Sequence, residues 1–261
     1  MNKLLTLPFV CMLLSAFVAC DNGVSEEEVG RKIELFSVTL AAPCKTDSSD
    51  TCEYGILFDD RDGQNYKTVK IGDQWWMAEN LNFETENSYC FNDQPERCEK
   101  YGRLYTWSAA MDSAFQWSIN GAYCGYGKIC TAVNPVRGVC PAGWHLPTEG
   151  EWKMLFAAVG DSAGPVEIPY RVEGVGKKLK STTGWQWLKG SDDYGFSLLG
   201  GGNKGSEGFY LLEYRQTDLW TSSEDSPYHV STLRFSDEND VISFGSWNKH
   251  FGLYVRCLKD N

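Results

Sequence analysis

The stretch Cys140–Gly160, CPAGWHLPTEGEWKMLFAAVG, decides the fold at the centre of the chain. Thr148 stands three residues before Glu151, which is the spacing of a helix capping box. The apolar residues that follow recur at helical spacing: Trp152, Leu155, Phe156 and Val159. Gly160 then suits a helix end. The stretch predicts an amphipathic helix that begins after Thr148 and stops at Gly160.

Upstream of this helix the sequence has the pattern of strands. The runs 66–71 and 74–77 are rich in β-forming residues and are separated only by Gly72-Asp73, a two-residue turn of the hairpin type. Just before them, the acids and glycine of 59–63 suggest a calcium loop but do not have the EF-hand spacing. We therefore predict a simple turn followed by a hairpin over 66–77.

A further helix is predicted over Tyr105–Phe115, because apolar residues recur there at helical spacing: Leu104, Trp107, Ala110 and Met111. Beyond residue 160, short apolar runs separated by glycines indicate strands: 195–199, 210–212, 219–221, 232–235, 241–244 and 253–256. The second half of the chain is therefore expected to consist of strands joined by long loops.

The N-terminus has the features of an export signal. Lys3 precedes an apolar run over 4–18, which is short for a transmembrane helix. The segment Phe17-Val18-Ala19-Cys20 resembles the lipobox of bacterial lipoproteins, in which the cysteine is acylated and becomes the mature N-terminus. We predict a signal peptide over 1–19 and lipidation of Cys20. The alternative is an ordinary signal peptide that contains a cysteine.

Composition and charge set the domain organisation. Residues 20–50 are polar with few aromatics, which indicates a flexible tether, although the apolar run 33–40 is compatible with a strand. Residues 51–261 are expected to form one large domain, since the chain is 42% hydrophobic and 14% aromatic. A net charge of −11 disfavours binding to nucleic acid and to anionic lipid, so we expect membrane contact through the lipid alone.

Cysteine usage indicates an exported, disulfide-stapled domain. With Cys11 in the signal and Cys20 lipidated, eight cysteines remain. Sequence proximity, and elimination for the last pair, predict four bridges: Cys44–Cys52, Cys90–Cys98, Cys124–Cys130 and Cys140–Cys257. Proximity is only a prior, because eight cysteines allow on the order of a hundred connectivities. No C-x-x-C is present, so neither a metal nor a cofactor is expected.

Several motifs carry a resemblance to a known family: DGQNYKTVKIG at 62–72, WMAENLN at 76–82, YGRLYTW at 101–107, CPAGWHLPT at 140–148, LWTSS at 219–223 and VRC at 255–257. Through them the chain resembles the Fibrobacter succinogenes major paralogous domain, a family of exported bacterial proteins. The resemblance covers about 200 residues and leaves only the tether and the signal outside it.

The resemblance also implies a fold. The family is similar to the C-type-lectin-like fold and to the related formylglycine-generating-enzyme fold, which implies an α+β domain with two short helices, antiparallel strands and long disulfide-stapled loops. In these folds a cysteine before a helical region pairs with one on the last strand, as Cys140 and Cys257 would. The calcium and sugar tripeptides of lectins are absent, and Trp247-Asn248-Lys249 has an ammonium group where calcium needs a carboxylate.

No catalytic constellation stands out. Cys257 is expected in a bridge, no nucleophile elbow is present, and His145, just before the helix, is expected to pack rather than to act as a base. Aromatic residues in loop-like stretches are the candidate ligand contacts instead: Trp185, Trp187, Tyr228 and Trp247.

The sequence thus predicts a lipid-anchored binding or display module of the cell envelope, in the outer membrane and facing the periplasm or the cell surface. Its expected partners are the membrane, through the lipid, and an extracellular glycan or protein bound by the loop face, with no nucleic acid. The alternatives are an enzyme related to the formylglycine-generating fold and a structural envelope protein without a small ligand.

Overall fold

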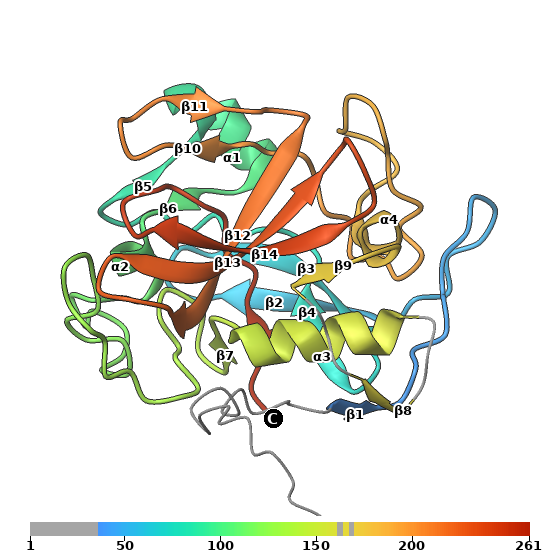
Figure 1. Cartoon of the computed structure of the whole chain (residues 1–261), viewed down its shortest axis with the longest axis horizontal. Coiled ribbons are helices and arrows are strands. Elements are labelled where there is room, and N and C mark those ends of the chain that lie inside the picture. The colour runs from blue at the N-terminus through green and yellow to red at the C-terminus, as the bar shows by residue number, and fades with distance from the viewer. Residues whose placement is uncertain (1–35, 161–163, 167–169) are drawn as a thin grey trace, which may run out of the picture. The chain divides into compact units, whose positions relative to one another are not determined.

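The computed structural model describes residues 36–160, 164–166 and 170–261 (Figure 1). This part of the chain combines short helices with strands whose ladders are all antiparallel, so it is an α+β arrangement, as predicted. The predicted signal peptide, Cys20 and the part of the tether up to residue 35 lie outside the described residues.

One sheet has five strands in the order β2-β3-β4-β15-β7. Their bounds are β2 (Tyr54–Asp59), β3 (Gln64–Ile71), β4 (Gln74–Met77), β15 (Leu258–Lys259) and β7 (Trp144–His145). The predicted hairpin is confirmed, since Ile71 pairs with Gln74 across the two-residue turn. Gly72 has a φ of +60°, which favours glycine at this turn.

A second sheet has four strands in the order β12-β13-β14-β9. Their bounds are β12 (Gln216–Glu224), β13 (His229–Ser236), β14 (Ile242–Asn248) and β9 (Arg171–Val172). Three of the apolar runs expected to form strands lie in this sheet: 219–221 in β12, 232–235 in β13 and 241–244 largely in β14. Apolar side chains of this sheet are buried in two core clusters: Leu219, Leu233, Phe235, Ile242 and Phe244 belong to one, and Trp220 and Val230 belong to the other.

The helix predicted from the capping box is present as α3 (Glu149–Val159). Thr148 accepts a hydrogen bond from the Glu151 N–H, and the Glu151 side chain accepts one from the Thr148 N–H at 2.8 Å. The ring of Trp152 lies 4.6 Å from that of Trp76 on β4, and the ring of Phe156 lies 5.8 Å from that of Phe244 on β14. The buried side of α3 therefore packs against both sheets.

The helix predicted over 105–115 is wrong in length. Only one turn is helical, α2 (Trp107–Ala110), while Leu104–Tyr105 forms strand β6 paired with β5 (Ser88–Tyr89). Asp112 ends the turn, because its φ is +53° and its carboxylate accepts hydrogen bonds from three N–H groups of the following loop: Gln116, Trp117 and Ser118. Local hydrogen bonding by an aspartate side chain competes with helix here.

Three further helical segments were not predicted: α1 (Pro95–Tyr101), α4 (Val175–Leu179) and the 3₁₀ turn η2 (Phe91–Asp93). All three are seven residues or shorter, so they lack room for a repeated apolar period. Two small ladders complete the set, β1 (Phe36–Val38) with β8 (Gly164–Val166) and β10 (Asn203–Lys204) with β11 (Tyr210–Leu211). β1 is the strand that the apolar run 33–40 indicated.

The folded domain begins before the boundary predicted at residue 51. The Ala41 N–H donates to the Ala158 carbonyl at 2.8 Å, and the N–H groups of Cys44 and Lys45 donate to the Asp193 carbonyl at 2.9 and 3.0 Å. Residues 41–45 are therefore bonded to the domain, and the stretch expected as the end of a tether is part of the fold.

All four predicted disulfides are present: Cys44–Cys52, Cys90–Cys98, Cys124–Cys130 and Cys140–Cys257. Three of them close short loops. The fourth joins residues 117 apart in sequence, just ahead of the neighbouring strands β7 and β15. It ties the end of the chain to the middle of the domain.

Candidate binding sites

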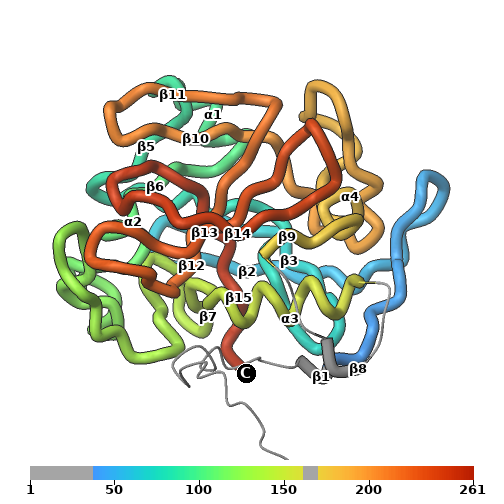
Figure 2. Tube along the Cα trace, in the orientation of Figure 1, coloured from blue at the N-terminus to red at the C-terminus, as the bar shows by residue number. Residues whose placement is uncertain are grey.

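A long loop over 113–134 carries an exposed apolar surface. It follows α2 and is drawn in green in Figures 1 and 2. Six large apolar side chains on it are exposed: Phe115, Ile119, Tyr123, Tyr126, Ile129 and Val133. Ile119 is 82% exposed. Isolated exposed apolar residues are ordinary, but six within one loop make it a candidate interaction surface.

Tyr228, one of the predicted ligand contacts, belongs to the same surface. Its ring lies 5.0 Å from that of Tyr126, and the Tyr126 ring stacks on His250 at 4.1 Å. The Gly127 N–H donates to the Pro227 carbonyl at 2.9 Å, so the two loops are joined by backbone as well. We call Tyr228 and the six side chains of the long loop the loop surface.

Buried groups hold the long loop in place from inside. The ammonium of Lys249, which is buried, donates to the carbonyls of Gly125 and Lys128 at 3.1 and 3.0 Å and to the carboxylate of Glu224. The Cys130 N–H donates to the other oxygen of Glu224 at 2.7 Å. The loop surface is therefore preorganised, which lowers the entropic cost of binding.

The charge of this loop differs from that of the rest of the chain. Residues 113–134 contain no aspartate or glutamate and only one charged side chain, Lys128, although the chain has a net charge of −11. A partner that reaches the loop surface would desolvate few charges, and the cores of protein interfaces are depleted in charge in the same way.

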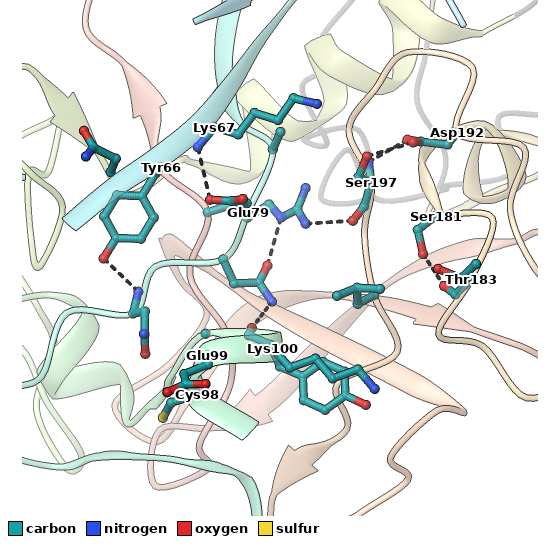
Figure 3. Close-up of a pocket in the computed structure, with 18 of the residues that line it drawn as sticks. Tyr66, Lys67, Glu79, Cys98, Glu99, Lys100, Ser181, Thr183, Asp192 and Ser197 are labelled. Carbon is teal, nitrogen blue, oxygen red and sulfur yellow. Dashed lines mark hydrogen bonds between the residues drawn. The ribbon is translucent and has the colours of Figure 1, made fainter. Parts of the chain in front are cut away.

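A second candidate site is a polar pocket of about 530 Å³ (Figure 3). Figure 3 shows its walls: Lys67 and Glu79 on one side, Ser181, Thr183, Asp192 and Ser197 on another, and Glu99 with Lys100 at the end of α1. This volume lies within the range of about 300–1,000 Å³ that is usual for ligand sites.

One wall of the polar pocket contains a buried cation. The Arg256 Nε donates to the Asn80 side-chain oxygen at 2.8 Å and its Nη1 donates to the Phe196 carbonyl. Burial lowers the pKa of Arg256 to about 9, so the guanidinium is still charged at neutral pH. Among the described residues no carboxylate forms an ion pair with it. Its hydrogen bonds go to neutral oxygens, while the carboxylates of Asp192 and Glu79 act on it from beyond ion-pair distance.

The neighbouring part of the wall is held by Asp192, which is buried. Its carboxylate receives hydrogen bonds from the Ser197 N–H at 2.6 Å and from the Ser197 hydroxyl at 2.7 Å, and the Lys45 ammonium lies 2.5 Å away. Asp192 and Ser197 both have φ near +55°. The Ser197 hydroxyl therefore helps to fix the turn through its bond to Asp192.

The other predicted ligand contacts do not join either site. Trp185 is only 4% exposed, and its indole N–H donates to the Leu198 carbonyl at 2.9 Å, so it is a core residue and not a ligand contact. Trp187 is 56% exposed and lies 4.2 Å from the Arg215 guanidinium. Trp247, half-buried on β14, lies 4.3 Å from the Arg234 guanidinium.

His145 connects α3 to the end of the chain. Its Nδ1 lies 2.7 Å from an Asp260 oxygen and its Nε2 lies 3.0 Å from a Glu151 oxygen. Burial lowers the pKa of His145, but the hydrogen bonds with Glu151 and Asp260 outweigh burial and raise the pKa above its ordinary value of 6.5. Both ring nitrogens are occupied by carboxylates, which fits the packing role predicted for this histidine.

Over 36–160, 164–166 and 170–261, no cluster of three or more histidine, cysteine or acidic side chains is arranged to hold a metal ion. Within the same ranges no helix has the length and apolar character needed to cross a membrane.

The fold and these sites define a disulfide-stapled α+β domain whose candidate sites are open surfaces and a polar pocket. The chain belongs to the Fibrobacter succinogenes major domain family, whose model matches residues 69–259. Comparison with curated proteins gives no match, and comparison with solved structures gives none either.

Most residues of the two sites were not predicted. The long loop had a usable signal, since residues 113–134 combine many apolar side chains with no acid around the Cys124–Cys130 bridge. The polar pocket had no such signal in the sequence. Its walls come from segments as far apart as Lys45 and Arg256, and each of them is an ordinary polar stretch when read alone.

Proposed function

We propose that this chain is an envelope-anchored binding module that holds an extracellular protein partner on its loop surface. The observation that carries the proposal is the concentration of seven exposed large apolar side chains over a loop fixed by Lys249 and Glu224. Tyrosine side chains contribute strongly to protein interfaces, and three of the seven are tyrosines: Tyr123, Tyr126 and Tyr228.

The shape of the surface favours a protein over a glycan. The ring planes of Phe115 and Tyr123 are inclined by 59°, and those of Tyr126 and Tyr228 by 60°, so neither pair offers a flat platform for a sugar. The aliphatic Ile119 and Ile129 add area that suits apolar protein side chains. The stacked pair of Tyr126 and His250, inclined by 29°, is the one flat element and supports a glycan as the second candidate.

The anchoring is part of the proposal. The Phe17-Val18-Ala19-Cys20 motif supports a lipid on Cys20 and hence attachment to the outer membrane, facing the periplasm or the cell surface. The four disulfides support an oxidising compartment outside the cytoplasm. The position of Cys140–Cys257, ahead of β7 and β15, supports the relation to the lectin-like folds.

Two other functions make different demands on the structure. An enzyme of the formylglycine-generating kind needs a free thiol, whereas all eight cysteines of residues 36–160 and 170–261 are in disulfides. A purely structural envelope protein has no need of an exposed apolar surface that is preorganised by buried groups. Both stay as alternatives to a binding module.

The experiment measures binding of the purified, fluorescently labelled chain to whole bacterial envelopes. The test variant Ile119→Ser/Tyr123→Ser removes two exposed side chains of the loop surface, and the control Phe209→Ser removes one equally exposed side chain elsewhere. We expect saturable binding that the test variant weakens at least tenfold and the control leaves unchanged.

Pretreatment of the envelopes identifies the partner class. Loss of binding after protease treatment supports a protein partner, and loss only after glycan hydrolysis supports the second candidate. Equal binding by wild type and the Ile119→Ser/Tyr123→Ser variant would show that the loop surface is not the binding site.

A further inference from the structure

The polar pocket lies beside an exposed apolar shelf. Asn65 and Lys67 of β3, which line the pocket, are paired in register with Phe58 and Ile56 of β2. Residues directly opposite in an antiparallel ladder point to the same face. Phe58 and Ile56 are 59% and 78% exposed, so an aromatic ring and an aliphatic side chain border the pocket on the side of β2.

The charge of the pocket is opposite in sign to that of the chain. Its lining contains four cations, Lys45, Lys67, Lys100 and Arg256, and three carboxylates, Glu79, Glu99 and Asp192. The chain as a whole has a net charge of −11. An excess of positive charge, small as it is, is therefore local to this pocket and favours an anionic ligand over a cationic one.

Two of the cations, Lys67 and Lys100, are also free to act on a ligand. Lys45 is paired with Asp192, but no ion pair within residues 36–160, 164–166 and 170–261 involves Lys67, Lys100 or Arg256. The Lys67 ammonium lies 3.6 Å from the centre of the Tyr54 ring, and that of Lys100 lies 4.8 Å from the Tyr101 ring. Ammonium groups held against aromatic faces keep their hydrogens for a ligand.

Neutral polar groups surround these charges. The lining includes four side-chain amides, Gln64, Asn65, Asn80 and Asn82, and the hydroxyls of Ser181, Thr182 and Thr183. Amides both donate and accept hydrogen bonds, which matches the many hydroxyl groups of a sugar. An exposed phenyl ring such as Phe58 can cover the apolar face of a sugar ring.

We infer that the polar pocket binds an acidic saccharide, with a carboxylate held by Lys67 and a ring face packed on Phe58. This site is separate from the loop surface and adds a glycan ligand to a module whose proposed partner is a protein. Arg256, behind the wall, supplies a fixed positive charge and does not need to touch the ligand.

The experiment titrates the purified chain with trigalacturonate, with its methyl ester and with an uncharged trisaccharide, by isothermal calorimetry at low salt. The methyl ester keeps the sugar and removes the charge without altering the protein. We expect trigalacturonate to bind at least tenfold tighter than its ester, and Lys67→Gln to bring that ratio close to one. Phe58→Ala is expected to weaken both ligands about equally.

Matched controls use residues of the same kind outside the pocket, Lys259→Gln and Phe209→Ala, which should leave both affinities unchanged. Ile119→Ser should do the same, so loss of the loop surface and loss of the pocket can be told apart. Equal affinity for acid and ester, no binding of either, or a ratio that Lys67→Gln leaves intact would overturn the inference. Binding of an acidic tripeptide as tight as that of trigalacturonate would overturn the saccharide part.

Discussion

The ammonium group of Lys249 forms a buried ion pair with the carboxylate of Glu224 beneath the loop surface. Two backbone carbonyls complete the surroundings of the ammonium, those of Gly125 and Lys128. An ammonium group has three hydrogens to donate, and these three oxygens accept them. Lys249, whose ammonium group disfavours calcium binding at this position, is thus itself the cation that holds the loop.

Replacement of Lys249 by methionine should destabilise the domain strongly. The change leaves the Glu224 carboxylate buried without its partner, and breaking a buried ion pair on one side costs about 3–5 kcal/mol. Chemical denaturation followed by tryptophan fluorescence measures the free energy of unfolding. Lys128 contributes only its backbone carbonyl to this site, so Lys128→Met is the control. It should change the free energy of unfolding by less than about 0.5 kcal/mol.

Replacement by alanine should lower the stability of the domain far more at Trp185 than at Trp187, two residues further along the chain. Trp185 is buried and hydrogen-bonded, and truncation of a buried tryptophan costs about 3–5 kcal/mol. Trp187 is half exposed and packs on Arg215, so its loss should cost about 1 kcal/mol or less. Thermal unfolding of the two variants side by side checks this, and similar melting temperatures would contradict the burial described here.

Stability should depend on pH through His145. Because its pKa is raised above 6.5, its stabilising contribution is complete below about pH 6.5 and is lost as the pH rises through the folded-state value. Burial raises the pKa of Glu151, but the hydrogen bonds from His145 and Thr148 outweigh burial and lower it below 4.5, so its contribution is lost when the pH falls below that value.

The pair should therefore contribute most between about pH 4.5 and 6.5. Denaturation midpoints of wild type and His145→Gln, measured from pH 4 to 9, test this. The difference between them should shrink as the pH rises above 6.5. A difference that stays constant over that range would show that the charge of His145 does not matter.

Removal of the Cys140–Cys257 disulfide should cost more than removal of any of the three local ones. Its loop spans 117 residues, for which chain entropy gives about 4–5 kcal/mol, whereas the Cys124–Cys130 loop spans 6. Paired serine substitutions and chemical denaturation provide the comparison. An equal loss from both pairs would mean that native contacts, and not loop entropy, set their contributions.

Local signals predicted a substantial part of the fold. The capping box and apolar spacing of α3 lie within one short stretch, and the hairpin of β3 and β4 depends only on Gly72-Asp73 between two β-rich runs. The helix expected from Tyr105 failed because the hydrogen bonds of Asp112 end it after one turn, and a count of apolar spacing does not include such bonds.

The sites were harder to predict because they depend on contacts between distant segments. Trp185 and Trp187 are two residues apart in similar sequence surroundings, yet one is in the core and the other on the surface. In an irregular loop no period relates position to burial, so composition could not separate them. Tyr228 was identified correctly as exposed, but its neighbours Tyr126 and His250 come from other parts of the chain.

The groups that fasten the long loop are different residues from those it displays. Lys249, Glu224 and the Cys124–Cys130 bridge hold the frame, while Ile119 and Ile129 face outward and take no part in it. If the loop surface binds a partner as proposed, copies of such a domain would diverge in what they bind by substitution of the displayed residues alone. Under the proposed function, recognition would vary as it does in antibodies, where variable loops change on a constant framework.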